Sequence, residues 1–549
     1  MEDTPRQLIV LCDGTNNNLT GGRADTNVLK LLHRLPPGDA RQQVFYDPGV
    51  GNPGELPSAT LLDSLSRRLE RIAGLAFGRG AYENMAESYA FLMRHYQPGD
   101  QIYIFGFSRG AFTARAVAGM VNQFGLLRPG LENMLPTLLH VYFSSRKGSA
   151  RKAQVAAVSA QIRSLFTDAQ RREVWVHFTG VWDTVASIGF PPFTRQITGS
   201  PTIAGKRMRH VRQALALDEH RRPFEPRLYL EDNIFPANAE GQTLKQEWFS
   251  GAHCDVGGGY AGAEAALSDQ TLDWLAREAA EQGLRLAPPE AADPARQRMV
   301  HCETWGTPWW AIAGLCVRDP RHAADENGRR HAIAPVAGPA PAQTSAQAPA
   351  LRYPKDTIWR RARRAAAPLL AGGAMVLLWL AMGLCLAGGL AGPGLGDGFG
   401  AAAVANAAFA AWQLWPFDSI GLILPNPEVA TKTALALDLA FIAAYGYLLA
   451  WLASRGFAAL AGLRGIASAR RPLLNFLGYG LTVLVAADLA EDLATLLILL
   501  FQNHWYGWLL GLLGLAMAAA SLAKWLGLLL TLVLLAAGLG AQLWHRSQR

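Results

Sequence analysis

The segment YIFGFSRGAFTARAVAGMV, residues 103–121, decides the fold of the N-terminal half of this chain. It joins a β-rich run to a helix-forming run through Gly106, Ser108 and Gly110, which make the pattern G-x-S-x-G. A sharp strand-to-helix turn of this kind lifts a serine hydroxyl out of a sheet, and the small flanking residues relieve crowding. The bare pattern is a weak signal in a chain with 55 glycines, and its strand and helix context strengthens it. We therefore predict that Ser108 is a nucleophile between two elbow glycines.

The region around this segment has the alternation of an α/β fold. From residue 1 to about 310, short β-rich runs alternate with helical segments, which predicts a sheet with helices on both faces. The clearest strands are residues 7–12, 101–106 and 173–183. Each runs directly into small or polar residues. Because sites in open α/β sheets form at the carboxyl ends of strands, we expect the chemistry at that edge.

A serine nucleophile needs a base, and the base needs an acid that orients it. His253 lies in WFSGAHCDVGGGY, before three glycines, and Asp183 ends the strand of residues 173–183. The order Ser108, Asp183, His253 is that of a serine hydrolase of the α/β type. Alternatives remain, since a single histidine is often structural, Asp183 could cap a helix, and Asp255 is a rival acid. On a strand, however, a residue two positions from His253 would point with it rather than toward it.

Backbone groups near the serine are candidates for stabilising an oxyanion. The N–H of Arg109 follows the nucleophile at the start of the predicted helix, and Gly14 and Thr15 follow the first strand. The alternative for LCDGTNNN is an ordinary turn, which Asp, Gly and Asn favour. No metal site or cofactor is expected, because the five cysteines show no CxxC spacing and form an odd set without a disulfide framework.

A series of segments gives this half a specific resemblance. In order along the chain they are LIVLCDGTNNN, Thr26 with Asn27, YDPGVG, GFSRGAFTAR, GVWDTVASIG, ALALDEHRRPF and WFSGAHCDVGGGY. Together they resemble the α/β-hydrolase family that contains the phospholipase effectors of bacterial type VI secretion. The resemblance covers roughly residues 6 to 280 and implies Ser108, Asp183 and His253 as a catalytic triad. Cys254 departs from the small polar residue expected at that position.

The second half of the chain has a different composition. Nearly all charged residues precede Arg364, while apolar stretches occupy about 365–391, 434–453, 473–501, 505–523 and 525–544. Most of these could span a bilayer as helices, although a buried bundle is the alternative. We predict a catalytic domain over 1–325, an Ala/Pro-rich linker over 326–358, and a transmembrane helical domain over 359–549 with four to six spans. The net charge of +8 comes from scattered residues, which argues against nucleic-acid binding.

Arginines predict the orientation of these helices. The cluster of residues 360–364 precedes the first apolar stretch, and four more arginines lie between the second and third. Such residues mark the cytoplasmic side, so the catalytic domain is expected in the cytoplasm of the producing cell, attached to a bacterial inner membrane. The third stretch holds Asp488, Glu491 and Asp492, which are costly in lipid unless they face a cavity or an interface.

Two functions follow from these observations. The first is a membrane-anchored serine hydrolase that cleaves carboxylic esters, with membrane phospholipid as the expected substrate and the bilayer as partner. The second is a channel or sensor in which the acidic residues line a polar path and the hydrolase-like domain only regulates. The residues identify no delivery or inhibitory partner. The presence of a complete serine, aspartate and histidine set favours the enzyme.

Overall fold

The computed structural model describes the chain in two compact units. One comprises Met1–Glu219, Pro223–His301 and Arg318–Pro354, and the other comprises His220–Arg222, Cys302–Val317 and Lys355–Arg549. The described residues are 5–14, 25–49, 75–144, 148–185, 187–188, 195–196, 202–231, 234–260, 262–289, 298–318, 320, 322–324, 330–332, 367–378, 427–462, 470–501 and 507–547. The expected arginine cluster at 360–364 and most of the linker lie outside these residues.

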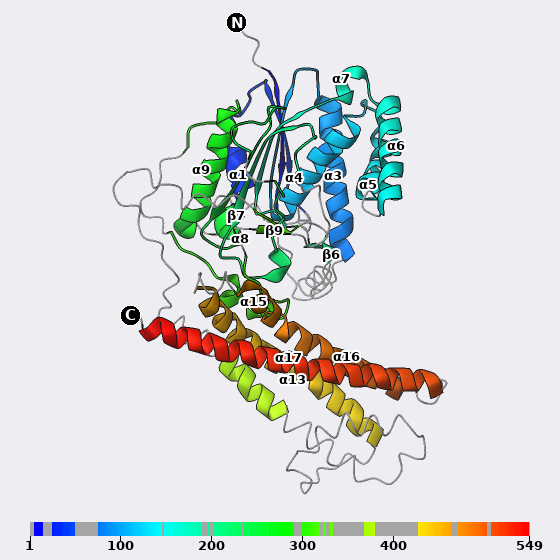
Figure 1. Cartoon of the computed structure of the whole chain (residues 1–549), viewed down its shortest axis with the longest axis vertical. Coiled ribbons are helices and arrows are strands. Elements are labelled where there is room, and N and C mark those ends of the chain that lie inside the picture. Colours follow the sequence, from blue (N-terminus) through cyan, green and yellow to red (C-terminus); the bar gives the residue numbers. More distant parts are fainter. Residues whose placement is uncertain are drawn as a thin grey trace. The chain divides into compact units, whose positions relative to one another are not determined.

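The first unit is built on a six-stranded sheet, confirming the predicted α/β class (Figure 1). The strand order is β2-β1-β3-β4-β7-β8, and every neighbouring pair is parallel. The order reverses between β1 and β3, which is the place where open α/β sheets form their sites. The strands are β1 (Gln7–Cys12), β2 (Gln42–Asp47), β3 (Gln101–Phe107), β4 (Val176–Trp182), β7 (Met208–Ala216) and β8 (Thr243–Phe249).

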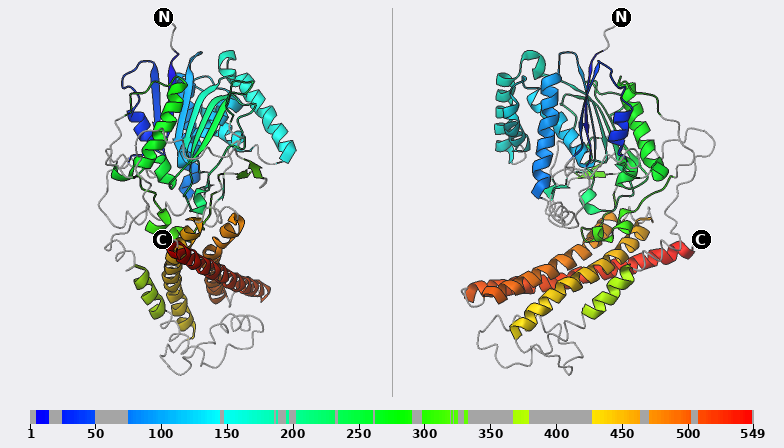
Figure 2. Two further views of the ribbon diagram at one scale, coloured as in Figure 1. Left: turned by 60° about the vertical axis from the view of Figure 1, so that its left-hand side comes forward. Right: turned by 180° about the vertical axis from the view of Figure 1, so that it is seen from behind.

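Helices cover both faces of this sheet (Figure 2). Buried residues of α3, α4, α5 and α6 form one hydrophobic core with the strands, and those of α1, α8 and α9 form the other. Such parallel strands are buried on both sides, which explains the unbroken apolar run LIVLC in β1. The helices are α1 (Asn27–His33), α3 (Leu75–His95), α4 (Ser108–Phe124), α5 (Leu135–Ser144), α6 (Gly148–Phe166), α7 (Ala169–Arg172), α8 (His253–Gly257) and α9 (Ala266–Glu281).

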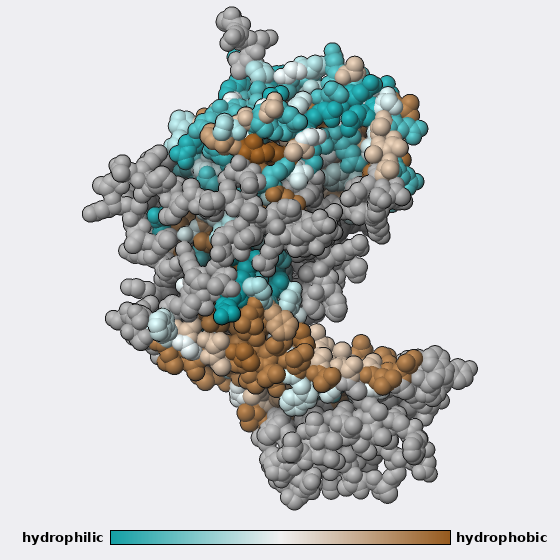
Figure 3. Space-filling view, viewed as in Figure 1, coloured by the Kyte–Doolittle hydropathy of each residue, from teal (hydrophilic) through white to brown (hydrophobic). Residues whose placement is uncertain are grey.

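The second unit is helical, as the sequence predicted. Its main helices are α13 (Pro427–Gly462), α15 (Arg471–Leu477), α16 (Gly480–Phe501) and α17 (Gly507–Ser547). Three segments are long and apolar enough to cross a membrane, namely Leu435–Gly462, Arg471–Leu497 and Leu512–Trp544, and a shorter apolar helix covers Ala367–Leu378. Leu493, Leu515 and Leu522 are exposed on these helices, whose surface is largely hydrophobic (Figure 3). An apolar surface of this extent is typical of contact with lipid.

One expectation about these helices is wrong. The stretches at 505–523 and 525–544 were expected as separate helices, but both lie within the continuous α17. Lys524 separates the two stretches in the sequence. It can lie inside one apolar helix because its ammonium pairs with acidic residues of α16. Its Nζ lies 2.5 Å from Asp488 Oδ1 and 3.2 Å from Glu491 Oε2. Tyr445 of α13 donates to the other oxygen of Asp488 at 2.5 Å. The costly acids are thus partly paired between helices.

A short segment before residue 318 packs in the helical unit. Ala311 and Leu315 are buried in the same core as Ile442, Phe457 and Leu474. The segment Cys302–Val317 therefore groups with the C-terminal helices, although the sequence placed it in the catalytic domain at 1–325. Of the predicted linker, the described residues 330–332 form β10 (Arg330–Ala332), which pairs with β9 (His322–Ala324). The predicted boundaries at 325 and 358 stay predictions.

Candidate active site

Ser108 occupies a strained turn between β3 and α4. Its φ is +59°, a left-handed value that non-glycine residues rarely adopt. The turn is held by close packing: a Cβ at Gly106 would lie 2.5 Å from the carbonyl oxygen of Gly110. At Gly110, a Cβ would lie on the carbonyl oxygens of Cys12 and Asp13. Both elbow glycines are therefore needed so that α4 can start directly against the end of β1.

Asp183 lies at the equivalent point of the neighbouring strand. β3 and β4 are parallel, and their register pairs Phe107 with Trp182, so Ser108 and Asp183 each follow one of two paired residues. Asp183 also has a positive φ, of +40°. Among the described residues, Ser108 and Asp183 are the two non-glycine positions with positive φ. Such strain costs energy and is concentrated at functional sites, so its occurrence at these two positions makes this sheet edge the candidate site.

His253 contacts Asp183 through a short hydrogen bond. Its Nδ1 lies 2.5 Å from Asp183 Oδ2, and because a carboxylate only accepts, Nδ1 carries the proton. The ring is 3% exposed and lies between Phe107 and Phe224, whose ring centroids are 4.7 and 4.9 Å away. Its Nε2 is buried and has no hydrogen-bond partner among the described residues. The ring thus has one nitrogen bound to an acid and the other left to act as a base.

Sequence reasoning missed one residue at this site. The buried guanidinium of Arg318 donates to both oxygens of Asp183, at 2.6 Å to Oδ1 and 3.0 Å to Oδ2. It also donates to the carbonyl oxygens of Ala216, at 2.6 Å, and Phe224. No motif surrounds Arg318, and it is 135 positions from Asp183 in sequence. No local signal could have revealed this pair.

The surroundings of Asp183 keep it ionised. The carboxylate is fully buried, and its Oδ1 also accepts a hydrogen bond from the N–H of Ala216 at 3.0 Å. Burial alone would raise the pKa of Asp183, but Arg318 and His253 hold that pKa below its ordinary value. A carboxylate that is anionic at neutral pH can stabilise a positive charge on the His253 ring.

The rival acid has a different partner. Asp255 accepts hydrogen bonds from the N–H groups of Ala252 and His301 and from His301 Nδ1, the last at 2.7 Å. The expectation that Asp255 follows His253 on a strand is wrong, because both residues lie in the short helix α8, which the Asp255 carboxylate caps. Burial would lower the pKa of His301, but its hydrogen bonds to Asp255 and Glu264 raise it. The histidine side chain that Asp255 binds is therefore His301, and the one that Asp183 binds is His253.

The backbone N–H groups expected to bind an oxyanion lie in different surroundings. Arg109 is the second residue of α4, at the end of the helix where backbone N–H groups point outward. The N–H of Gly14 donates to Asp13 Oδ1 at 2.7 Å, so in this structure it is already engaged, and its role at an oxyanion stays a prediction. Asp13 Oδ2 accepts from Thr26 and Tyr46, which ties this turn to α1 and β2. Thr15 lies outside the described residues.

No metal centre accompanies these residues. Within the described part of the chain, no three histidine, cysteine or acidic side chains are grouped so that they could hold a metal ion. The four cysteines described, Cys12, Cys254, Cys302 and Cys316, form no disulfide with one another.

Comparison with known proteins identifies the family of the N-terminal domain. Residues 6–278 match the family described as "T6SS, Phospholipase effector Tle1-like, catalytic domain". The uncharacterized protein YEL023C of Saccharomyces cerevisiae is 34% identical over 224 residues, which cover 40% of this chain and 32% of the yeast protein. The match thus spans about a third of that relative. Residues 6–278 therefore form a catalytic domain of the family of Tle1-like phospholipase effectors, a family of phospholipase-type hydrolases.

Proposed function

We propose that the chain is a membrane-anchored serine hydrolase that cleaves carboxylic esters through Ser108, His253 and Asp183. His253 Nε2 takes the proton of the Ser108 hydroxyl as Oγ attacks the ester carbonyl. The alcohol then leaves with that proton, and an acyl group stays on Ser108. Water, deprotonated by the same nitrogen, releases the acid and restores the serine. Asp183 holds the ring in the tautomer that this sequence of steps requires.

The observation that carries this proposal is the state of the His253 ring. Nδ1 is hydrogen-bonded to an ionised, buried carboxylate, and Nε2 is buried without a partner among the residues that the structure describes. A structural histidine in a core would have its second nitrogen satisfied, because an unpaired buried polar atom is costly. The strained turn at Ser108, whose neighbour Phe107 packs against the His253 ring, would supply the hydroxyl for such a base.

Arg318 is proposed as a positioning residue for Asp183. Its two hydrogen bonds fix both carboxylate oxygens, so the one that faces His253 cannot rotate away. The planar fork of a guanidinium suits this bidentate contact better than a lysine would. For the oxyanion, the N–H of Arg109 at the start of α4 is the proposed donor, and Thr15 is the proposed second donor.

Phospholipid is the proposed substrate class. The family description supports it, as does a helical unit whose exposed leucines suit a bilayer. Several helices in the membrane would keep the catalytic domain beside its substrate. The arginines at 360–364 and between α13 and α15 support an arrangement with the catalytic domain on the cytoplasmic side, and we propose a bacterial inner membrane as its site.

Labelling with a fluorophosphonate tests the triad directly. Such a reagent reacts with a serine only when a neighbouring base activates it. The full-length protein in detergent should be labelled at one residue, Ser108, as located by peptide mass spectrometry. His253→Ala should lose the label while keeping the thermal stability of the wild type within a few degrees. Failure of the folded wild type to react, or labelling at another serine, would contradict the assignment.

A further inference from the structure

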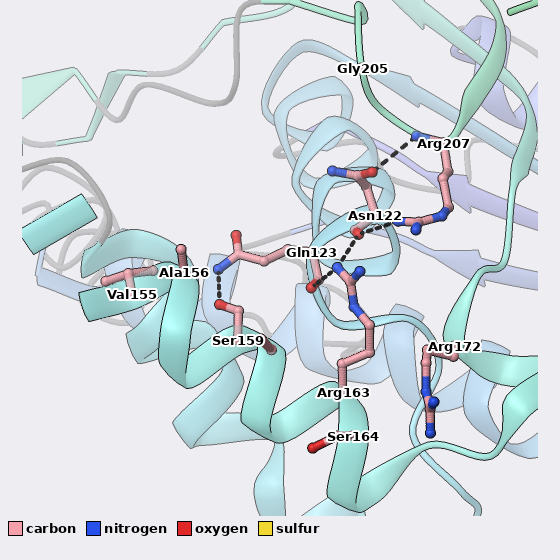
Figure 4. Close-up of a pocket in the computed structure, with 11 residues that line it drawn as sticks. Asn122, Gln123, Val155, Ala156, Ser159, Arg163, Ser164, Arg172, Gly205 and Arg207 are labelled. Carbon is pink, nitrogen blue, oxygen red and sulfur yellow. Dashed lines mark hydrogen bonds between the residues drawn. The ribbon is translucent and has the colours of Figure 1, made fainter. Parts of the chain in front are cut away.

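A second site candidate lies at the far end of α4 from Ser108. A cavity of about 590 Å³ opens beside Asn122 and Gln123, in the last turn of that helix. Fourteen residues separate Ser108 from Asn122, which corresponds to about 21 Å along a helix. The cavity is therefore distinct from the place where Ser108 would react. Its other walls come from α6, from the end of α7 and from the segment before β7 (Figure 4).

Three of the lining side chains are arginines, and none is acidic. Arg163, Arg172 and Arg207 come from α6, from α7 and from the segment before β7 (Figure 4). Glu173 supplies a counter-charge: its carboxylate lies 3.1 Å from the Arg207 guanidinium, and its side chain is 70% exposed. An ion pair that is so exposed is screened by water and neutralises little. The cavity thus keeps an excess of positive charge.

Structural roles account for part of this cluster only. Arg163 donates to the carbonyl oxygens of Asn122, at 2.9 Å, and Gln123, so it caps the C-terminus of α4. Its Nε, however, is buried and has no hydrogen-bond partner in the described part of the chain. Burial and then the charges of Arg207 and Arg172 lower the pKa of Arg163. Arg172 is exposed and forms no hydrogen bond or ion pair with any residue that the structure describes.

We propose that this cavity binds a phosphate-bearing anion. Its volume lies within the usual range for small-molecule sites. A phosphate group offers several acceptor oxygens and one or two negative charges, which suits converging guanidinium forks. On the same wall, the Ser159 hydroxyl accepts from Gln123 and keeps its own proton to donate. A single carboxylate would neutralise less of the charge. The ligand is either the headgroup of an anionic lipid or a soluble phosphate compound.

Calorimetric titration with pyrophosphate tests the site, using the full-length protein in phosphatidylcholine nanodiscs. Arg172→Gln and Arg207→Gln should each weaken binding about tenfold, and the double variant about a hundredfold, as expected for lost charge-assisted hydrogen bonds. Arg163 is left intact because it caps α4. The matched control is Arg277→Gln, an exposed arginine of α9 on the opposite face of the sheet, which should bind like the wild type.

A second variant guards against loss of folding. Ala160→Glu places a carboxylate in the wall of the cavity without removing an arginine, and it should also weaken binding at least tenfold. Equal affinity in the wild type, the double variant and Ala160→Glu would overturn the proposal. So would undetectable pyrophosphate binding by the wild type, or an equal loss in Arg277→Gln, which would show that only the overall charge matters.

The source of the phosphate is decided in the Ser108→Ala background, where lipid should stay intact. Nanodiscs that contain phosphatidic acid should weaken pyrophosphate binding by competition if the cavity accepts a lipid headgroup. An unchanged affinity would assign the cavity to a soluble phosphate compound. Because pyrophosphate binding needs no hydrolysis, loss of the triad assignment and loss of this site are separable results.

Discussion

Replacing Arg318 with methionine should both destabilise the protein and disturb its catalysis. The change removes the guanidinium that bonds both oxygens of Asp183 and the carbonyl oxygens of Ala216 and Phe224. Methionine has a similar length and no donor. Asp183 would keep the N–H of Ala216 and the ring of His253, which do not compensate its burial. An uncompensated carboxylate would then remain in the core.

The expected loss of stability is large because both partners are buried. Removing one member of a buried ion pair costs about 3–5 kcal/mol. For a domain of this size that corresponds to a fall in Tm of roughly 5–9 °C. The matched control is Arg94→Met, which breaks the exposed pair with Glu132, where the arginine side chain is 58% exposed. That pair should contribute less than about 1 kcal/mol.

The activity of Arg318→Met should depend on pH in a defined direction. In the wild type the pKa of Asp183 lies below its ordinary value, and Arg318 is a principal cause. Without Arg318, burial dominates and that pKa rises, so the carboxyl is protonated over part of the acidic range. Protonated Asp183 cannot stabilise a charged His253. We therefore expect kcat/KM on a soluble ester to fall more at pH 6 than at pH 9.

A double-mutant cycle separates this account from simple loss of packing. In the Asp183→Asn background the carboxylate is gone, so adding Arg318→Met should cost at least about 2 kcal/mol less than it does in the wild type. Thermal unfolding followed by circular dichroism gives both values. Equal losses in the two backgrounds, together with an unchanged pH profile, would refute the role given to Arg318.

Three further predictions concern other parts of the molecule. Asp183→Asn should lower kcat on a soluble ester about ten-thousandfold. Asp255→Asn should keep kcat within tenfold of the wild-type value and lower Tm. The reverse result would make Asp255 the acid that orients His253. Burial raises the pKa of Asp47 to about 6, so its ionisation costs stability as the pH rises from about 4 to 6. Above pH 6, Asp47→Asn should therefore raise the free energy of unfolding by roughly 1–3 kcal/mol and raise Tm, whereas near pH 4 it should change neither. A gain in stability that is the same at both pH values would contradict this reasoning. Position 398 lies between the first and second apolar stretches, and position 468 lies between the second and third, beside the arginines. In a cysteine-free background, an impermeant thiol reagent added outside the cell should label Gly398→Cys and spare Ser468→Cys. The opposite pattern would invert the proposed topology.

The sequence revealed those parts of the site that depend on neighbouring residues. The elbow at Ser108 could be predicted because a strand, two glycines and a helix lie in one short segment. Asp183 could be placed because it directly ends a strand. The parallel register of β3 and β4 then brings these two positions to neighbouring strand ends, as the α/β pattern implies.

Features that depend on distant residues could not be predicted. Arg318 and Asp183 are 135 positions apart, so no residue near either one in the sequence indicates that they form a hydrogen bond. Lys524 interrupts an apolar sequence and so suggests a break between two spans, because its acidic partners on α16 are distant in the sequence. The engagement of the Gly14 N–H by Asp13 depends on the geometry of a turn, which composition does not specify.

Mass spectrometry of lipids is the most direct test of the central claim. Phospholipid bilayers should be incubated with the full-length wild type and, in parallel, with Ser108→Ala at equal amounts of folded protein. The wild type should release free fatty acid and lysophospholipid in matching quantities, and Ser108→Ala should release neither above background. Equal release by the two proteins, or release of a phosphorylated headgroup with diacylglycerol in place of fatty acid, would contradict a serine esterase that acts through Ser108.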